Sequence, residues 1–151
     1  MSKEKTLIIG GGQAACQTAT SLKSKKYDGE IKIFCSENYL PYQRPPLSKK
    51  FLMGELDKER LFFKPEKFYT ENEISINLNS FVQRIDIENK EIFLENNKKE
   101  NYDNLVIATG TTPRKIDFDK KISDKVFYLR SIGDVLNIRD KIKESKRVTI
   151  I

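Results

Sequence analysis

The stretch Leu7-Ile-Ile-Gly-Gly-Gly-Gln-Ala-Ala15 lies almost at the start of the chain and decides its fold. Three apolar residues typical of a buried strand run into a glycine cluster, and helix-forming sequence follows. Gly10 permits a tight turn, and Gly12, which has no Cβ, lets an anion approach the backbone. Ala15 is small enough for the helix to pack closely on the strand.

The residues from Gln13 to about Ser24 can form this helix, with Ala14, Ala19 and Leu22 turned inward. Its first N–H groups and the positive end of its dipole would face the turn. The pattern therefore predicts a site for the pyrophosphate of a dinucleotide. An ordinary glycine-rich turn without a ligand is the alternative. The predicted contacts are Gly10, Gly12, Gln13, Ala14 and Ala15.

A second apolar strand is predicted over Ile31–Cys35, which completes a strand–helix–strand unit. In such a unit, an acidic side chain after the second strand accepts hydrogen bonds from a ribose. Glu37, preceded by Ser36, stands at this position. The alternative for Glu37 is a plain surface position.

The next segment, Pro41-Tyr-Gln-Arg-Pro-Pro-Leu-Ser-Lys49, holds three prolines that keep it stiff and extended. Such a loop can present a cation to a phosphate or to an electron-rich ring with little ordering cost. Arg44 and Lys49 are its candidate cations. A proline-rich linker is the alternative. A short helix is expected to follow, to about Leu52, and to end near Gly54.

The remaining pattern predicts further elements of a mixed α/β fold. Small residues at the end of one apolar strand, Ala108-Thr-Gly110, would let a ligand approach the backbone, and Arg114 follows in a loop. Ser131 and Asp134 resemble a capping box, which we prefer to a flavin-contacting Gly-Asp pair. The predicted helices span 64–72 and 131–144. The predicted strands are an edge strand at 74–76, a hairpin of 81–87 and 91–95 with a second turn at 96–97, and strands at 105–110, 126–129 and 147–151.

Composition sets limits on function. The 151 residues are 38% hydrophobic and 33% charged, with a net charge of +6. Basic residues alternate with acidic ones, which argues against nucleic acid as a partner. There is no histidine and no Cys-x-x-Cys, so neither a metal site nor a dithiol redox centre is expected. No apolar run approaches about 18 residues and no signal peptide is evident, so we expect a cytoplasmic protein with no membrane partner.

The segments 8–15, 41–49 and 105–110 together resemble the FAD-dependent pyridine nucleotide oxidoreductases, and most closely their ferredoxin reductase branch. The proline loop is the most specific part, supported by the hairpin and by Tyr128-Leu-Arg-Ser131. The resemblance implies a Rossmann-like parallel sheet with an inserted antiparallel hairpin or meander. It implies the N-terminal part of an FAD-binding domain at 1–145 and the first strand of an NAD(P)-binding domain at 146–151.

The resemblance also implies roles for residues. Gly10, Gly12 and the first turn of the helix would hold the FAD pyrophosphate, and Glu37 the adenosine ribose. Lys49 would be the catalytic residue, beside the flavin ring near the atom that accepts hydride. Relatives often carry an acidic residue where this chain has Ser36. The other implied cofactor contacts are Arg44, Val82, Ala108, Thr109, Gly110 and Arg114.

By resemblance, the complete protein would pass electrons from NAD(P)H through FAD to an iron–sulfur ferredoxin or a similar acceptor. The second nucleotide fingerprint is absent, so the 151-residue chain is not expected to turn over alone. Two alternatives remain: a non-catalytic FAD-binding module or remnant, and a Rossmann-type protein that binds NAD at the glycine turn. The sequence does not indicate an oligomeric state.

Overall fold

A computed structural model describes residues 3–119 and 122–151. They form two compact units, each built from two separate stretches of chain. The first unit comprises Met1–Tyr42 and Phe62–Gly110. The second comprises Gln43–Leu61 and Thr111–Ile151.

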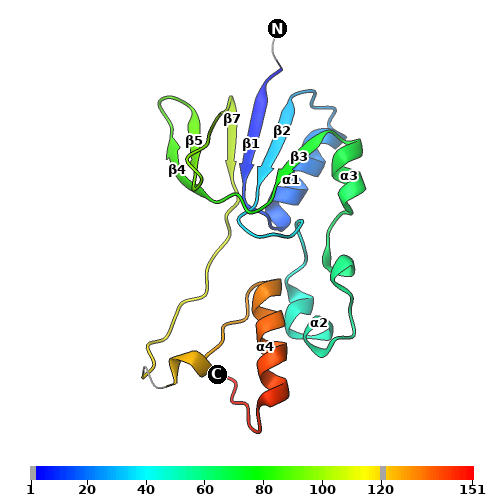
Figure 1. The fold of residues 1–151 in the computed structure, drawn as a ribbon. Coiled ribbons are helices and arrows are strands. Elements are labelled where there is room, and N and C mark those ends of the chain that lie inside the picture. The colour runs from blue at the N-terminus through cyan, green and yellow to red at the C-terminus, as the bar shows by residue number, and fades with distance from the viewer. Residues whose placement is uncertain (1–2, 120–121) are drawn as a thin grey trace. The chain divides into compact units, whose positions relative to one another are not determined.

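A four-stranded parallel sheet is the centre of the first unit (Figure 1). Its order is β3-β2-β1-β7, so the first strand lies between partners from distant parts of the sequence. Ile8 of β1 lies opposite Ile33 of β2 and Val106 of β7. This arrangement confirms the predicted parallel α/β fold. The strands are β1 (Lys5–Ile9), β2 (Glu30–Phe34), β3 (Ile74–Asn77) and β7 (Asn104–Ile107).

The two faces of this sheet are covered differently. Helix α1 (Gln13–Ser24) and the short α3 (Glu66–Glu71) cover one face. The other face packs against an antiparallel sheet of order β4-β5-β6 through a second apolar cluster. Because β1 and β2 are buried on both faces, they read as nearly continuous apolar runs. The antiparallel strands are β4 (Val82–Asp86), β5 (Glu91–Leu94) and β6 (Lys99–Asn101).

The second unit is mainly helical. Helix α4 (Ile132–Glu144) buries Ile132 and Val135 and contacts both the turn η1 (Pro45–Ser48) and α2 (Lys50–Met53). The hydroxyl of Ser131 accepts a hydrogen bond from the backbone N–H of Asp134, and the Asp134 carboxylate accepts one in return from the N–H of Ser131. The predicted capping box is therefore confirmed. The unit also holds two single turns, η2 (Lys58–Leu61) and η3 (Ser123–Lys125).

Three expectations from the sequence need correction. The segments 126–129 and 147–151 are not strands; no strand pairs with either in the described part of the chain, and Ile150 and Ile151 are exposed. The helix expected from residue 64 begins only at Glu66, because Pro65 is extended and caps it from outside. The turn at 96–97 leads into β6, a polar three-residue strand that the sequence did not predict.

Candidate functional site

The glycine turn is fixed between the ends of two strands. The backbone N–H of Gly10 donates to the carbonyl of Phe34 at the end of β2, at 2.9 Å. Gly10 has a φ of +130°, and a Cβ there would lie 2.1 Å from the carbonyl oxygen of Ala108. Both the backbone angle and the space exclude any other residue, which supports the predicted tight turn.

Gly12 has the opposite surroundings. It is the N-cap of α1 with an extended backbone, and no atom lies within 4 Å of the place where a Cβ would stand. No side chain caps α1, and its first turn holds no acidic residue. The first N–H groups of α1 therefore donate to no capping side chain and face open space. This is the arrangement that binds anions at helix N-termini.

The first turn of α1 agrees with the pattern at Ala15, but the expectation that Ala14 turns inward is wrong. Ala15 is fully buried against the sheet, whereas Gln13 and Ala14 are exposed. A pyrophosphate fits this cradle by the chemistry of its donors, which are backbone N–H groups at the positive end of a 12-residue helix.

The side chain of Cys35 packs against the glycine turn at Gly11. The sequence did not indicate this packing role. A Cβ on Gly11 would lie 2.9 Å from the Sγ of Cys35, so the thiol packs directly under the turn. Burial, helped by the negative charge of Glu37, raises the pKa of the Cys35 thiol to about 12. A thiol with so high a pKa is a packing group rather than a nucleophile.

Glu37 follows β2, as predicted, and its carboxylate is half-buried. The hydroxyl of Tyr42 donates a hydrogen bond to Oε2 of Glu37 at 2.6 Å, and Tyr42 is only 3% exposed. The main-chain carbonyl of Glu37 accepts from the N–H of Asn79 at 3.2 Å. Ser36 is exposed beside it. The sequence placed Tyr42 in the stiff loop but gave no sign of its bond to Glu37.

The strand β7 ends beside the glycine turn. It ends at Ile107, so the expected continuation of the strand to Gly110 is wrong. The N–H of Ala108 still donates to the carbonyl of Ile9 at 2.8 Å, and Thr109 and Gly110 beyond it are exposed. Val82, predicted to meet an adenine through its backbone, begins β4 and is half-buried. The first unit therefore brings the ends of β1, β2 and β7 to one edge of the parallel sheet, the edge where ligands bind in such folds.

Three predicted contacts belong to the second unit. The guanidinium of Arg44 donates to the main-chain carbonyl of Arg130 at 2.6 Å, which ties the proline loop to the start of α4. Lys49 is exposed and is the N-cap of α2. Arg114 is exposed in a segment without regular secondary structure.

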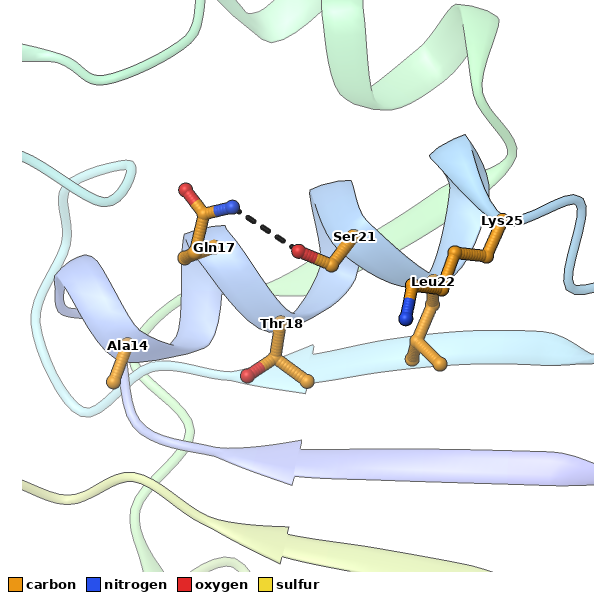
Figure 2. A pocket seen from close by; sticks show the side chains of 6 residues that line it. All are labelled: Ala14, Gln17, Thr18, Ser21, Leu22 and Lys25. Carbon is orange, nitrogen blue, oxygen red and sulfur yellow. Dashed lines mark hydrogen bonds between the residues drawn. The ribbon is translucent and has the colours of Figure 1, made fainter.

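A shallow pocket of about 470 Å³ runs along the outer side of α1 (Figure 2). Its lining combines apolar side chains, Ala14 and Leu22, with polar ones, and Gln17 donates to the hydroxyl of Ser21 at 3.0 Å within it. Of the predicted site residues, only Ala14 lines it. The pocket therefore follows the side of the helix rather than its N-terminus.

Residues 3–119 and 122–151 hold neither a metal-ligand cluster nor a membrane-spanning helix. No cluster of cysteine and carboxylate side chains suited to a metal ion was found there. Within the same residues, no helix is both long enough and apolar enough to cross a membrane.

Comparison with known proteins defines the class. The family of pyridine nucleotide-disulphide oxidoreductases matches residues 4–151, so the chain belongs to this family. Proteins of the family and its ferredoxin reductases depend on FAD and use NAD(P)H.

The particular relatives are reductases of small electron carriers. A rubredoxin-NAD(+) reductase of Ectopseudomonas oleovorans is 39% identical over 145 residues, which are 96% of this chain and 38% of the relative. The ferredoxin reductase for the CYP199A2 system of Rhodopseudomonas palustris is 36% identical with a TM-score of 0.87, over 93% of this chain and 35% of that one. The NADH:rubredoxin oxidoreductase of Clostridium acetobutylicum is 32% identical with a TM-score of 0.83, over 95% of this chain and 36% of that one. The chain thus spans little more than a third of these relatives.

Proposed function

We propose that this chain is the FAD-binding portion of a reductase that passes electrons from NAD(P)H through FAD to a ferredoxin-like acceptor. The observation that carries the proposal is the open cradle at Gly12. There the uncapped N-terminus of α1 lies at the same sheet edge as the carboxylate of Glu37, which follows β2. Family membership supports FAD as the ligand, and the electron-carrier reductases among the relatives support the acceptor.

In this proposal, each group of residues has one task. The N–H groups that follow Gly12 bind the pyrophosphate, and Glu37 accepts hydrogen bonds from the adenosine ribose. The backbone of Val82 meets the adenine, and Lys49 lies beside the flavin ring. FAD, when bound, supplies the step from a two-electron donor to one-electron acceptors. The remaining contacts come from Ser36, Arg44, Arg114 and the segment 108–110.

The domain assignment is also a proposal. Residues 1–145 would form the N-terminal part of the FAD-binding domain, and residues 146–151 would lead into an NAD(P)-binding domain.

The first experiment measures the binding of FAD, FMN and NAD to the purified chain by isothermal titration calorimetry, and also follows flavin fluorescence and the visible spectrum for the two flavins. We expect FAD to bind in preference to FMN, because FMN lacks the adenosine half that Glu37 would recognise. Binding of NAD but not FAD would overturn the proposal in favour of a Rossmann-type NAD protein.

A non-catalytic FAD-binding module is the second candidate. It would need only the cradle at Gly12 and the carboxylate of Glu37, both of which belong to the first unit. The two candidates are separated in a chimera, in which this chain replaces the matching portion of the rubredoxin-NAD(+) reductase of Ectopseudomonas oleovorans. NADH is added anaerobically to the flavin-loaded chimera. Bleaching of the flavin near 450 nm (about the ordinary oxidised-flavin maximum, set by the cofactor) and transfer to an added ferredoxin support the reductase. Bound flavin that NADH cannot bleach supports the module.

A further inference from the structure

The hydrogen bond between Tyr42 and Glu37 links the proline loop to the proposed ribose site. The two oxygens are 2.6 Å apart. The carboxylate can only accept, so the tyrosine hydroxyl donates, and a bond of this length to a charged acceptor is a strong one. Tyr42 is 3% exposed, so little water competes for its hydroxyl.

The tyrosine itself is held by backbone pairing. Tyr42 forms an isolated antiparallel bridge with Phe62, and the N–H of Phe63 donates to the carbonyl of Pro41 at 3.0 Å. The ring of Tyr39 packs edge-on against the ring of Tyr42, with their centroids 6.4 Å apart. The hydroxyl therefore has a fixed position before any ligand arrives.

The carboxylate is held at two levels. Its backbone is fixed by the bond from Asn79, and its Oε2 by the bond from Tyr42. A flexible glutamate would lose rotamer freedom on binding a ribose, whereas one that is already oriented loses less. The smaller loss of rotamer entropy makes the oriented glutamate bind the ribose more tightly.

We propose that Tyr42 is a positioning residue that orients the Glu37 carboxylate for the hydroxyls of the adenosine ribose. This inference rests on the proposed function, since it takes FAD as the ligand. It adds a specificity element, because only ligands with those ribose hydroxyls gain from the oriented carboxylate.

The test compares Tyr42→Phe with Tyr27→Phe in the 151-residue chain. Tyr27 is a matched control, because its hydroxyl also makes one partly buried side-chain hydrogen bond, to Thr6 at 2.8 Å, away from the glycine turn. The probes are FAD and an FAD analogue that lacks the 2′ and 3′ hydroxyls of the adenosine ribose. We expect Tyr42→Phe to raise the Kd for FAD about 3- to 10-fold and to leave the Kd for the analogue unchanged. Tyr27→Phe should change neither.

A double-mutant cycle with Glu37→Ala asks whether Tyr42 acts through Glu37. In the Glu37→Ala background, Tyr42→Phe should have no further effect on the Kd for FAD. An undiminished effect there would overturn the proposal, as would a Tyr42→Phe variant that weakens FAD and the analogue equally.

Two further outcomes are informative. If Tyr42→Phe does not fold, Glu37→Gln takes its place; a Glu37→Gln chain that distinguishes FAD from the analogue as the wild type does would overturn the ribose role. If the wild type binds FAD but Tyr42→Phe binds it equally well, only this inference falls. If the wild type binds no FAD, the proposed function falls with it.

Discussion

Gly10 and Gly12 stand two residues apart but are glycine for different reasons. Gly10 needs its positive φ and has no room for a Cβ, whereas Gly12 has an extended backbone and open space. The fold requires the first, whereas we propose that the second is glycine because a ligand approaches it. This distinction separates folding from binding in the same turn.

Alanine substitutions at the two glycines should therefore have different effects. Gly10→Ala should lower the free energy of unfolding by more than about 2 kcal/mol, because the turn must move away from Ala108. Gly12→Ala should leave that free energy within about 0.5 kcal/mol of the wild type and weaken FAD binding at least tenfold. Urea unfolding and flavin titration measure the two quantities. Equal FAD affinity in Gly12→Ala and the wild type would show that no phosphate approaches there.

Cys35 should resist thiol reagents in the folded chain. Its pKa, raised from 9.0 to about 12, lowers the thiolate population about a thousandfold at neutral pH. Replacing Cys16 by serine leaves Cys35 as the thiol that is labelled. In this variant, Cys35 should react with a disulfide reagent at pH 8 only as fast as the chain unfolds, whereas in urea it should react at once. The pKa of Cys35 is higher in the folded chain than in the unfolded chain, so the folded state holds the thiol proton more tightly. The contribution of this proton to the free energy of unfolding is complete below the unfolded pKa and is lost as the pH rises through the folded pKa. Fast labelling of the native chain would contradict this.

Residue identities predicted the ligand class better than they predicted the contacts. The segments 8–15, 41–49 and 105–110 resemble the correct family, and the glycine spacing by itself predicted a dinucleotide site. The bond from Tyr42 to Glu37 and the packing of Cys35 under Gly11 depend on where the chain returns in space. A tyrosine or a cysteine is compatible with many such neighbours.

At the scale of elements, prediction succeeded where the apolar pattern is long and failed where the strand is short. The buried strands and α1 were found because their apolar runs are continuous or periodic. β6 was missed because its three residues are polar and pair only with β5. The segments 126–129 and 147–151 have strand composition, but a strand also needs a neighbour.

The capping box of α4 offers a test of an element that was predicted correctly. Ser131→Ala should lower the free energy of unfolding by about 1 kcal/mol, because the N–H of Asp134 loses its acceptor. Asn137→Ala is the control: it is an exposed position in the same helix and should be neutral or slightly stabilising. Urea unfolding followed by circular dichroism measures both. A Ser131→Ala chain as stable as Asn137→Ala would show that the cap contributes nothing.

At the scale of the whole molecule, the charge is divided unequally. The first unit carries 12 basic and 13 acidic residues, and the second carries 16 basic and 9 acidic residues. The second unit therefore carries a net charge of +7 and the first a net charge of −1. A positive surface of this kind accelerates the association of an acidic partner at low ionic strength.

Charge reversal in the second unit should slow the binding of an acidic [2Fe–2S] ferredoxin to the chain. With Lys141→Glu and Lys143→Glu combined, we expect the association rate constant at low salt to fall several-fold, and the difference to vanish above about 0.5 M salt. Lys67→Glu and Lys64→Glu, combined in the first unit, make the matched control. Interferometry over a salt series measures the rates. An equal loss in both pairs would mean that only total charge matters.

The excursion from Gln43 to Leu61 begins and ends at a narrow neck. Tyr42 bridges Phe62, and the N–H of Gln43 donates to the carbonyl of Leu61 at 2.9 Å. Since the cost of closing a loop grows only with the logarithm of its length, such a neck tolerates segments of different size. A homologous excursion of another length could therefore replace this one, provided that α4, which packs on it, is exchanged with it, while the parallel sheet keeps its register.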